Sequence, residues 1–106
     1  MPETSGYRLT PAASADIEAI VGFLNERNPI AAVRFLEALQ ASIEYVVGLP
    51  LAHPRLDTSN PALRDVRSRP LTGAFARYLL FYAARGDTVL VIRVLHSARD
   101  IGAILQ

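Results

Sequence analysis

Residues 77–100 decide the fold, and they read RYLLFYAARGDTVLVIRVLHSARD. They predict two strands, over residues 78–84 and 88–96, joined by a tight turn in which Gly86 supplies the positive φ angle that short hairpins need. The second strand, TVLVIRVLH, is nearly all apolar instead of alternating between apolar and polar residues. We therefore expect it in the middle of a sheet, with both of its faces covered.

A short helix is predicted after this hairpin, over residues 97–106. Ser97 and Asp100 have the S-x-x-D spacing of a helix start, in which the serine oxygen caps free backbone N–H groups and the acid lies at the positive end of the helix dipole. The buried strand would thus deliver His96, and soon after it Arg99, to a junction between strand and helix.

Two further helices are predicted upstream, after a short strand over residues 6–10. The pairs Thr10-Pro11 and Asn28-Pro29 each place a good capping residue before a proline at the first helical position. Apolar residues then recur at helical spacing after both starts, until Gly48 and Pro50 end the second helix. With almost no linker between them, the two helices should form an antiparallel hairpin that covers one face of the sheet.

A strand of mixed polarity is predicted over residues 63–69, between a proline-rich loop and Pro70. Its arginines and the proline suit the edge of a sheet. The predicted order of elements is therefore β-α-α-β-β-β-α. It describes an α+β fold, in which an antiparallel sheet of about four strands packs against the N-terminal helical hairpin, and the chain, residues 1–106, forms one domain with a short C-terminal helix.

The composition excludes several classes of protein. None of the 106 residues is a cysteine, which excludes a disulfide scaffold, thiolate metal sites and thiol catalysis and fits a reducing cytoplasm. No apolar run approaches the roughly 18 residues of a membrane span, and the N-terminus has no export signal. We therefore expect a cytoplasmic protein without a membrane partner.

The charges are unevenly distributed, although the formal net charge is only +1. Residues 1–53 hold three arginines and six acidic residues, a balance of −3, whereas residues 54–106 hold eight arginines and four acidic residues, a balance of +4. The C-terminal half therefore carries a positive field that fits an acidic partner or phosphates. No lysine is present, and +1 is a weak charge for a protein that binds the ribosome.

His96 is the candidate for general acid–base chemistry. Cutting RNA requires a proton acceptor, a proton donor and cations on the phosphate, which His96, Tyr78 and Arg93 could supply. The alternative, which we favour, is that His96 and Arg99 only tie the strand to its helix by hydrogen bonds. His53 lies in a proline-flanked loop with no partner at metal-ligand spacing, so neither a metal site nor a cofactor is predicted.

The chain resembles the RelE/ParE superfamily of bacterial type II toxins, and its ParE branch in particular. The resemblance begins with YRLTPAA at residues 7–13 and continues with Asp16-Ile17, the proline-started second helix and YLLFY at residues 78–82. It closes on RVLHSARD at residues 93–100, which is the most specific of these motifs. Together the motifs cover nearly the whole length of the chain.

The resemblance implies a small toxin that a cognate ParD-like antitoxin holds inactive. ParE-like members poison DNA gyrase, whereas RelE-like members are endoribonucleases that cut mRNA on the ribosome and tend to carry catalytic Tyr, His, Arg or Lys residues near the C-terminus. Here no Tyr, Arg or Lys follows Arg99. We therefore predict a gyrase inhibitor with no reaction centre and no direct sequence-specific DNA binding. A ribosome-dependent endoribonuclease and a decayed toxin kept for regulation are the alternatives.

Two groups of residues are assigned to binding. We expect Arg64, Arg67 and Arg69, on the predicted edge strand, to meet carboxylates of the antitoxin, which would add a strand there or lay a helix nearby. Arg99, Ile104 and Leu105, at the C-terminal end of the chain, are the residues expected to contact the target.

Overall fold

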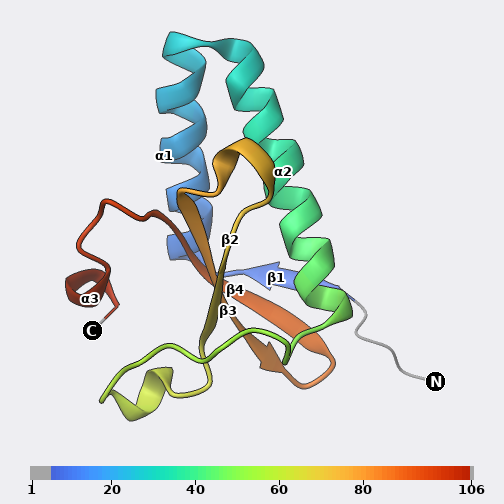
Figure 1. Ribbon diagram of the computed structural model, residues 1–106, viewed down its shortest axis with the longest axis vertical. Helices are drawn as coiled ribbons and strands as arrows, with labels where there is room; N and C mark the ends of the chain where they lie inside the picture. The colour runs from blue at the N-terminus through green and yellow to red at the C-terminus, as the bar shows by residue number, and fades with distance from the viewer. Residues whose placement is uncertain (1–5, 106) are drawn as a thin grey trace.

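The computed structural model describes residues 6–105, and Figure 1 shows how its helices and strands are arranged. Its elements, in chain order, are β1 (Tyr7–Leu9), α1 (Pro11–Arg27), α2 (Pro29–Gly48), β2 (Arg67–Pro70), β3 (Tyr78–Arg85), β4 (Thr88–His96) and α3 (Ile101–Ile104). Two short 3-10 helices, Pro61–Leu63 and Gly73–Phe75, lie on either side of β2 in the chain. The predicted α+β fold and its order of elements are confirmed.

Within residues 6–105 the four strands form one sheet, in the order β1-β4-β3-β2. β4 has a neighbour on each side, as predicted for the most apolar strand. β2 and β3 pair antiparallel, and so do β3 and β4, but β1 pairs parallel with β4. The sheet is therefore mixed and not antiparallel throughout, because the helical hairpin, and not a tight turn, leads the chain away from β1.

The local signals for helix starts are confirmed. The Thr10 hydroxyl oxygen accepts a hydrogen bond from the Ala13 N–H (3.0 Å), and the Asn28 side chain accepts from the N–H groups of Ile30 (3.1 Å) and Ala31 (3.3 Å). Each cap satisfies N–H groups that the first helical turn leaves free, and a proline follows each cap where its missing N–H costs nothing.

The C-terminal helix is much shorter than predicted. It begins at Ile101, and its cap is Asp100, whose Oδ1 accepts a hydrogen bond from a backbone N–H of the helix (3.2 Å). Ser97 lies too early in the chain to cap it: its N–H donates to the Arg77 carbonyl across the hairpin (2.7 Å), so the pairing of β3 with β4 extends to Ser97 and the helix starts only after Asp100. Strand pairing has overridden the local S-x-x-D signal. Gln106, the last residue of the predicted helix, lies outside the described residues.

The edge strand begins later than predicted. Asn60-Pro61 opens a 3-10 helix, in which the Asn60 side chain accepts a hydrogen bond from the Ala62 N–H (3.0 Å). This is the same capping device that starts α2, although the prediction placed a loop and a strand here. β2 is consequently confined to Arg67–Pro70, and Arg64 lies outside it, at the end of the 3-10 helix.

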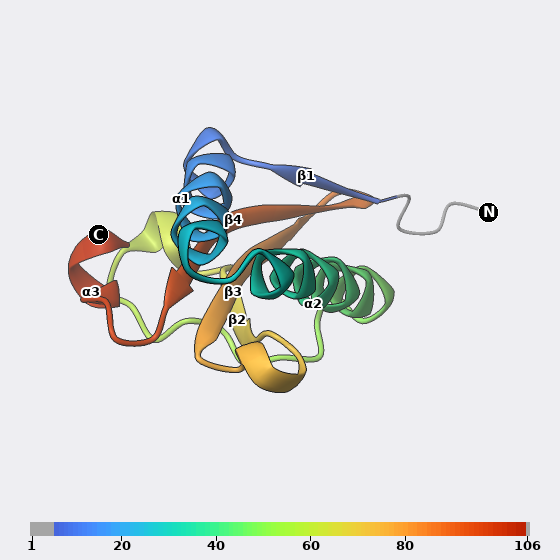
Figure 2. The same ribbon diagram turned by 90° about the horizontal axis from the view of Figure 1, so that it is seen from above.

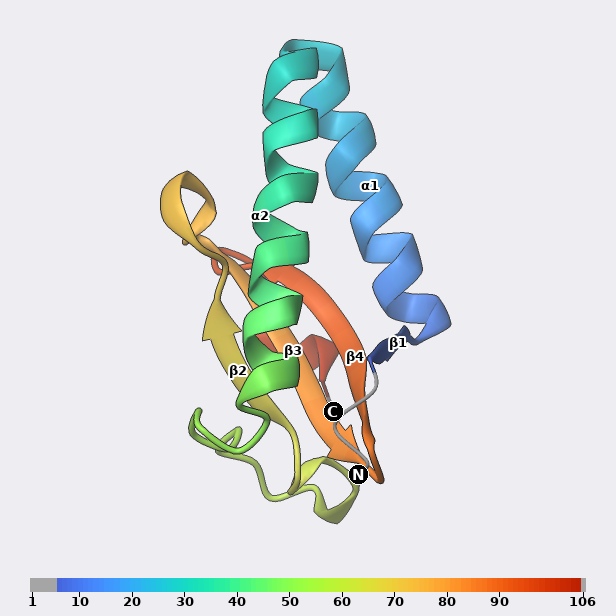
Figure 3. The same ribbon diagram turned by 90° about the vertical axis from the view of Figure 1, so that its right-hand side faces the viewer.

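The sheet has a different cover on each face, as Figures 2 and 3 show. α1 and α2 lie on one face, and α3 lies on the other. The buried residues on the helical-hairpin side are Ala13, Phe35, Leu39, Ile43, Val46, Leu71, Leu80, Tyr82, Val89, Val91 and Val94. Those on the α3 side are Val66, Phe81, Leu95 and Leu105. Both faces of β4 are thus covered, as its apolar sequence predicted.

A β-bulge in β4 decides which residues face the helical hairpin. The pairing of β3 with β4 shifts by one residue, which leaves Ile92 as an extra residue of β4. Without the bulge, every second residue after Val91 would point toward the hairpin, Arg93 included. With it, Val94 and then His96 point that way.

Replacing Phe35 with alanine tests the core under the helical hairpin. Phe35 is 0% exposed and meets the rings of Phe75 and Tyr78 edge to face, at centroid distances of 5.6 and 5.2 Å. We expect Phe35→Ala to lower the free energy of unfolding by about 3–5 kcal/mol, because a large cavity replaces the ring. Phe23→Ala is the control: Phe23 is 52% exposed, and its loss should cost about 1 kcal/mol or less. Urea unfolding measures both, and equal losses would contradict this assignment of the core.

Candidate functional site

A cleft of about 330 Å³ opens between α1 and the C-terminal end of β4. Its lining residues are Asp16, Ala19, Ile20 and Phe23 from α1, Tyr78 from β3, Val94 and His96 from β4, and Arg99 from the segment after β4. The volume is at the small end of the range for binding sites. The structure thus brings together three residues that the sequence singled out, namely Tyr78, His96 and Arg99.

The His96 ring is held by its own chain. Its Nδ1 accepts a hydrogen bond from the Ala98 N–H (3.0 Å), and its ring meets the Tyr78 ring edge to face, with the centroids 5.0 Å apart. A neutral ring that accepts at Nδ1 carries its proton on Nε2. Burial raises the pKa of Tyr78 above its ordinary value, so the phenol stays protonated at neutral pH. His96 therefore ties the end of β4 to the next turn. Of the hydrogen bonds expected from His96 and Arg99, the structure shows one at the His96 ring, whereas Arg99 contributes its backbone N–H, which donates to the His96 carbonyl (2.9 Å).

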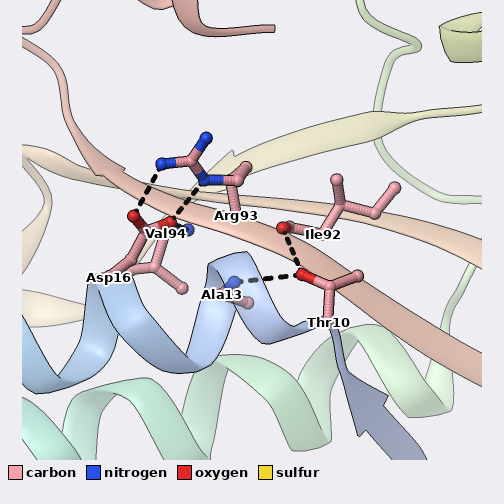
Figure 4. Close-up of polar contacts among 6 residues, drawn as sticks. All are labelled: Thr10, Ala13, Asp16, Ile92, Arg93 and Val94. Atoms are coloured by element: carbon pink, nitrogen blue, oxygen red, sulfur yellow. Dashed lines mark hydrogen bonds and ion pairs between the residues drawn. The ribbon is translucent and has the colours of Figure 1, made fainter.

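Arg93 does not join His96 and Tyr78 in the cleft. Its guanidinium binds Asp16 with two hydrogen bonds, from Nε to Oδ2 (2.7 Å) and from Nη2 to Oδ1 (2.8 Å), and Figure 4 shows the two side chains facing each other. The side chains of Arg93 and Asp16 are only 22% and 9% exposed. The hydrogen bonds to Asp16 raise the pKa of Arg93. Of the alternative catalytic set, His96 and Tyr78 line the cleft, whereas Arg93 is engaged with Asp16 and is not among the lining residues.

Asp16 has a second role, at the edge of β4 that β1 leaves bare. β1 pairs with only the first part of β4, and beyond it α1 bonds to the strand. The Thr10 hydroxyl donates to the Ile92 carbonyl (2.7 Å), and Asp16 Oδ2 accepts from the Val94 N–H (3.0 Å), as Figure 4 shows. Asp16 and Arg93 are 77 residues apart, so no local pattern reveals the contact. Its one signal in the sequence was its place in the motif that carried the family resemblance.

The arginines predicted to bind an antitoxin are largely engaged within the chain. Arg67 Nη1 donates to the His53 carbonyl (2.6 Å), and the Arg69 guanidinium lies over the Tyr45 ring, 4.4 Å from its centroid. Arg69 Nη1 is buried and has no hydrogen-bond partner within residues 6–105. Arg64 is exposed, although it lies outside β2. Their role in antitoxin binding stays a prediction.

The three residues predicted to bind the target differ in exposure. Arg99 is exposed at the rim of the cleft. Ile104 is half-buried and Leu105 is 8% exposed, and both pack on the α3 side of the sheet. Leu105 therefore presents little surface to a target, and its role in target binding stays a prediction. Arg99 is the residue of this group that a partner can reach most readily.

Two further kinds of feature bear on function, a cluster of metal ligands and a membrane-spanning helix. Within residues 6–105, no three His, Cys, Asp or Glu side chains lie close enough together to hold a metal ion. Over the same range, no helix combines the length and the apolar character needed to span a bilayer. His53 contacts aromatic rings instead, those of Tyr45 and Tyr82.

The architecture has a solved counterpart. A chain of a structure described as "Chromosomal ParDE TA system from P. aeruginosa" superposes on this chain with a TM-score of 0.66, over 86% of this chain and 94% of that chain. The two sequences are 16% identical, so this likeness concerns the fold alone. The protein has a ParE-like α+β fold.

The family is shown by the sequence itself. Residues 7–101 match the family model described as "ParE toxin of type II toxin-antitoxin system, parDE". Because the match covers most of the chain, this protein belongs to the ParE toxin family of type II toxin–antitoxin systems. A comparison with curated proteins found no match. The resemblance to the ParE branch is thus confirmed.

Replacing Asp16 tests the contact between α1 and β4. Asp16→Ala leaves the largely buried Arg93 guanidinium and the Val94 N–H without their acceptor. We expect the free energy of unfolding to fall by about 3 kcal/mol. Asp65→Ala is the control, because Asp65 pairs with Arg85 and these side chains are 48% and 49% exposed, which limits the contribution to about 1 kcal/mol. Thermal or urea unfolding compares the two, and similar losses would refute the role of Asp16.

Proposed function

We propose that this ParE toxin inhibits DNA gyrase by binding to it, without a reaction of its own, and that a cognate ParD-like antitoxin neutralises it. The observation that carries the binding role is that the proton acceptors lining the cleft, His96 Nδ1 and the Asp16 carboxylate, are already engaged within the chain. An RNA-cleaving site needs a proton acceptor, a proton donor and a cation around one phosphate. In this chain Asp16 is bound by Arg93, and His96 Nδ1 accepts from the Ala98 N–H, so the cleft cation Arg99 has neither of these acceptors free beside it.

The cleft suits an apolar side chain of a protein partner. Its wall is largely apolar, formed by Ala19, Ile20, Phe23, Val94 and the ring of Tyr78. The His96 Nδ1 is already bonded, and the charge of Asp16 is already paired. Arg99 is exposed at the rim and has no ion pair within the described residues. An apolar pocket beside an available arginine is typical of the anchor points of protein interfaces.

An acidic antitoxin fits the charge of the second half of the chain. Residues 54–106 carry a balance of +4, and β2 is an edge strand of the sheet. We assign antitoxin binding to Arg64, Arg67 and Arg69, which we call the arginine border. The description of the P. aeruginosa relative supports an antitoxin partner, because it names a ParDE toxin–antitoxin system.

A supercoiling assay with purified DNA gyrase tests the proposal. We expect the toxin to block the supercoiling of relaxed plasmid, or to trap cleaved plasmid, and to leave mRNA intact in a translating extract. Arg99→Ala should raise the concentration for half-inhibition about tenfold, as for the loss of a central arginine contact. Arg34→Ala, which removes an exposed arginine of α2, is the matched control and should change it by less than about twofold.

Two other outcomes would refute gyrase inhibition. Cleavage of ribosome-bound mRNA, with gyrase unaffected and with the activity lost in His96→Ala, would identify an endoribonuclease. If the folded wild-type chain had no effect on either target, it would be a decayed toxin. Circular dichroism of the same preparation establishes that the chain is folded.

A further inference from the structure

The edge of β2 is not open along its whole length. Residues 53–56, which we call the strap, run beside its start: Arg55 forms an antiparallel bridge with Arg67, and the Leu56 N–H donates to the carbonyl of the residue before β2 (2.6 Å). β2 ends at Pro70, which has no N–H to donate. A strand from a partner therefore finds the first part of this edge occupied.

We propose that the strap is an internal substitute for a partner strand, that the antitoxin must displace it, and that His53 is the latch that holds it. This inference rests on the proposed function, because it concerns the regulation of the same arginine border. Antitoxin binding is then a competition between two segments for one sheet edge. The strap has the advantage of being tethered, which gives it a high effective concentration at the edge.

His53 fixes the strap through both its backbone and its ring. Its carbonyl accepts from Arg67 Nη1 (2.6 Å), its Nδ1 lies 3.2 Å from the Tyr82 hydroxyl oxygen, and its ring meets the Tyr45 ring with the centroids 5.6 Å apart. Tyr82 is fully buried, and its hydroxyl has no other hydrogen-bond partner within residues 6–105, so we place its proton on the side of Nδ1. The latch is therefore anchored in the core.

The rest of the strap is lightly held. The chain between α2 and Pro61–Leu63 contains neither a helix nor a strand, and Pro54 and Arg55 are exposed. Leu56 packs only partly against the core on the α3 side. Segments with few buried contacts open locally without unfolding the protein. The strap can therefore leave the edge while the sheet stays intact.

Protonation of His53 is an experimental means of opening the latch. The groups that face His53 are Tyr45 from α2, Arg67 and Arg69 from β2, and Tyr82 from β3. A protonated ring cannot accept from Tyr82 and adds a positive charge beside the two arginines. Burial, and after it the charge of Arg69, lowers the pKa of His53. The latch is thus fully present above the unfolded-state pKa of about 6.5 and weakens as the pH falls below that value.

Amide hydrogen exchange of the full chain tests the latch. The Leu56 N–H reports on the strap, because it is bonded beside β2. We expect His53→Ala and Tyr82→Phe each to lower its protection factor about fivefold, as for the loss of one hydrogen bond. Lowering the pH to about 5.5 should lower it in the wild type and not in His53→Ala.

The exchange experiment has two controls. Tyr7→Phe also removes one tyrosine hydroxyl, here from an exposed hydrogen bond, and should leave Leu56 unchanged. The Ile43 N–H, in the buried middle of α2, is the internal reference for global stability. Wild-type protection of Leu56 in both latch variants would overturn the role of His53.

A reducible lock tests displacement of the strap. The chain has no cysteine, so Arg55→Cys combined with Arg67→Cys places one pair of thiols at the bridge, within reach of a disulfide. We expect the oxidised chain to bind purified ParD-like antitoxin at least about tenfold more weakly than the same chain after reduction, because a covalent closure cannot be displaced. The comparison uses one protein in two redox states, so the loss of two arginines affects both equally.

The outcomes of the lock experiment separate the two proposals. The reduced form must bind the antitoxin although it lacks Arg67. Equal and measurable binding by the oxidised and reduced forms would then show that the strap stays in place and would overturn displacement. Failure of the wild-type chain itself to bind the antitoxin would refute the antitoxin part of the proposed function. In that case the exchange of Leu56 would still decide whether His53 holds the strap.

Discussion

The contact of Asp16 with β4 is the one on which the placement of the helices over the sheet depends. β1 has three residues and β4 has nine, so most of that edge of β4 lacks a neighbouring strand. The Thr10 hydroxyl and the Asp16 carboxylate satisfy backbone groups there, and Arg93 neutralises the carboxylate. A buried backbone group without a partner is costly, so α1 is held where it can supply one. The cleft exists because α1 lies there.

The bulge at Ile92 sets the chemistry of that cleft. One inserted residue exchanges the faces of all residues that follow it in the strand. Val94 and His96 therefore face α1, whereas Arg93 turns to the edge and meets Asp16. The same irregularity that lets Val94 complete the core thus leaves Arg93 out of the lining of the cleft, where Arg99 is the cation beside the histidine. The bulge is thus the common cause of the packing of Val94 in the core and of the absence of Arg93 from the lining of the cleft.

Local signals predicted most of the fold, whereas the candidate site depends on contacts between distant segments. Capping pairs such as Asn28-Pro29 mark helix starts in any context. The equivalent pair Asn60-Pro61 was missed, because the 3-10 helix that follows it is a single turn. One turn is too short to show apolar residues recurring at helical spacing. The pairing of Asp16 with Arg93 joins α1 to β4. The two residues are 77 positions apart, so the sequence around one gives no indication of the other. The sequence gives no sign of the bulge either. Both faces of β4 are covered and apolar, so its sequence looks the same whichever residues point toward the helical hairpin.

The construction of β2 has a consequence for the protein before it meets any partner. An unpaired edge strand can form backbone hydrogen bonds with the edge strand of another copy, which leads to aggregation. Here one end of the edge is filled by residues 53–56, and the other ends in a proline that cannot donate. This edge therefore offers little bare backbone for pairing with a second copy of the chain. Residues 53–56 thus also shield the start of β2 from a strand of another copy.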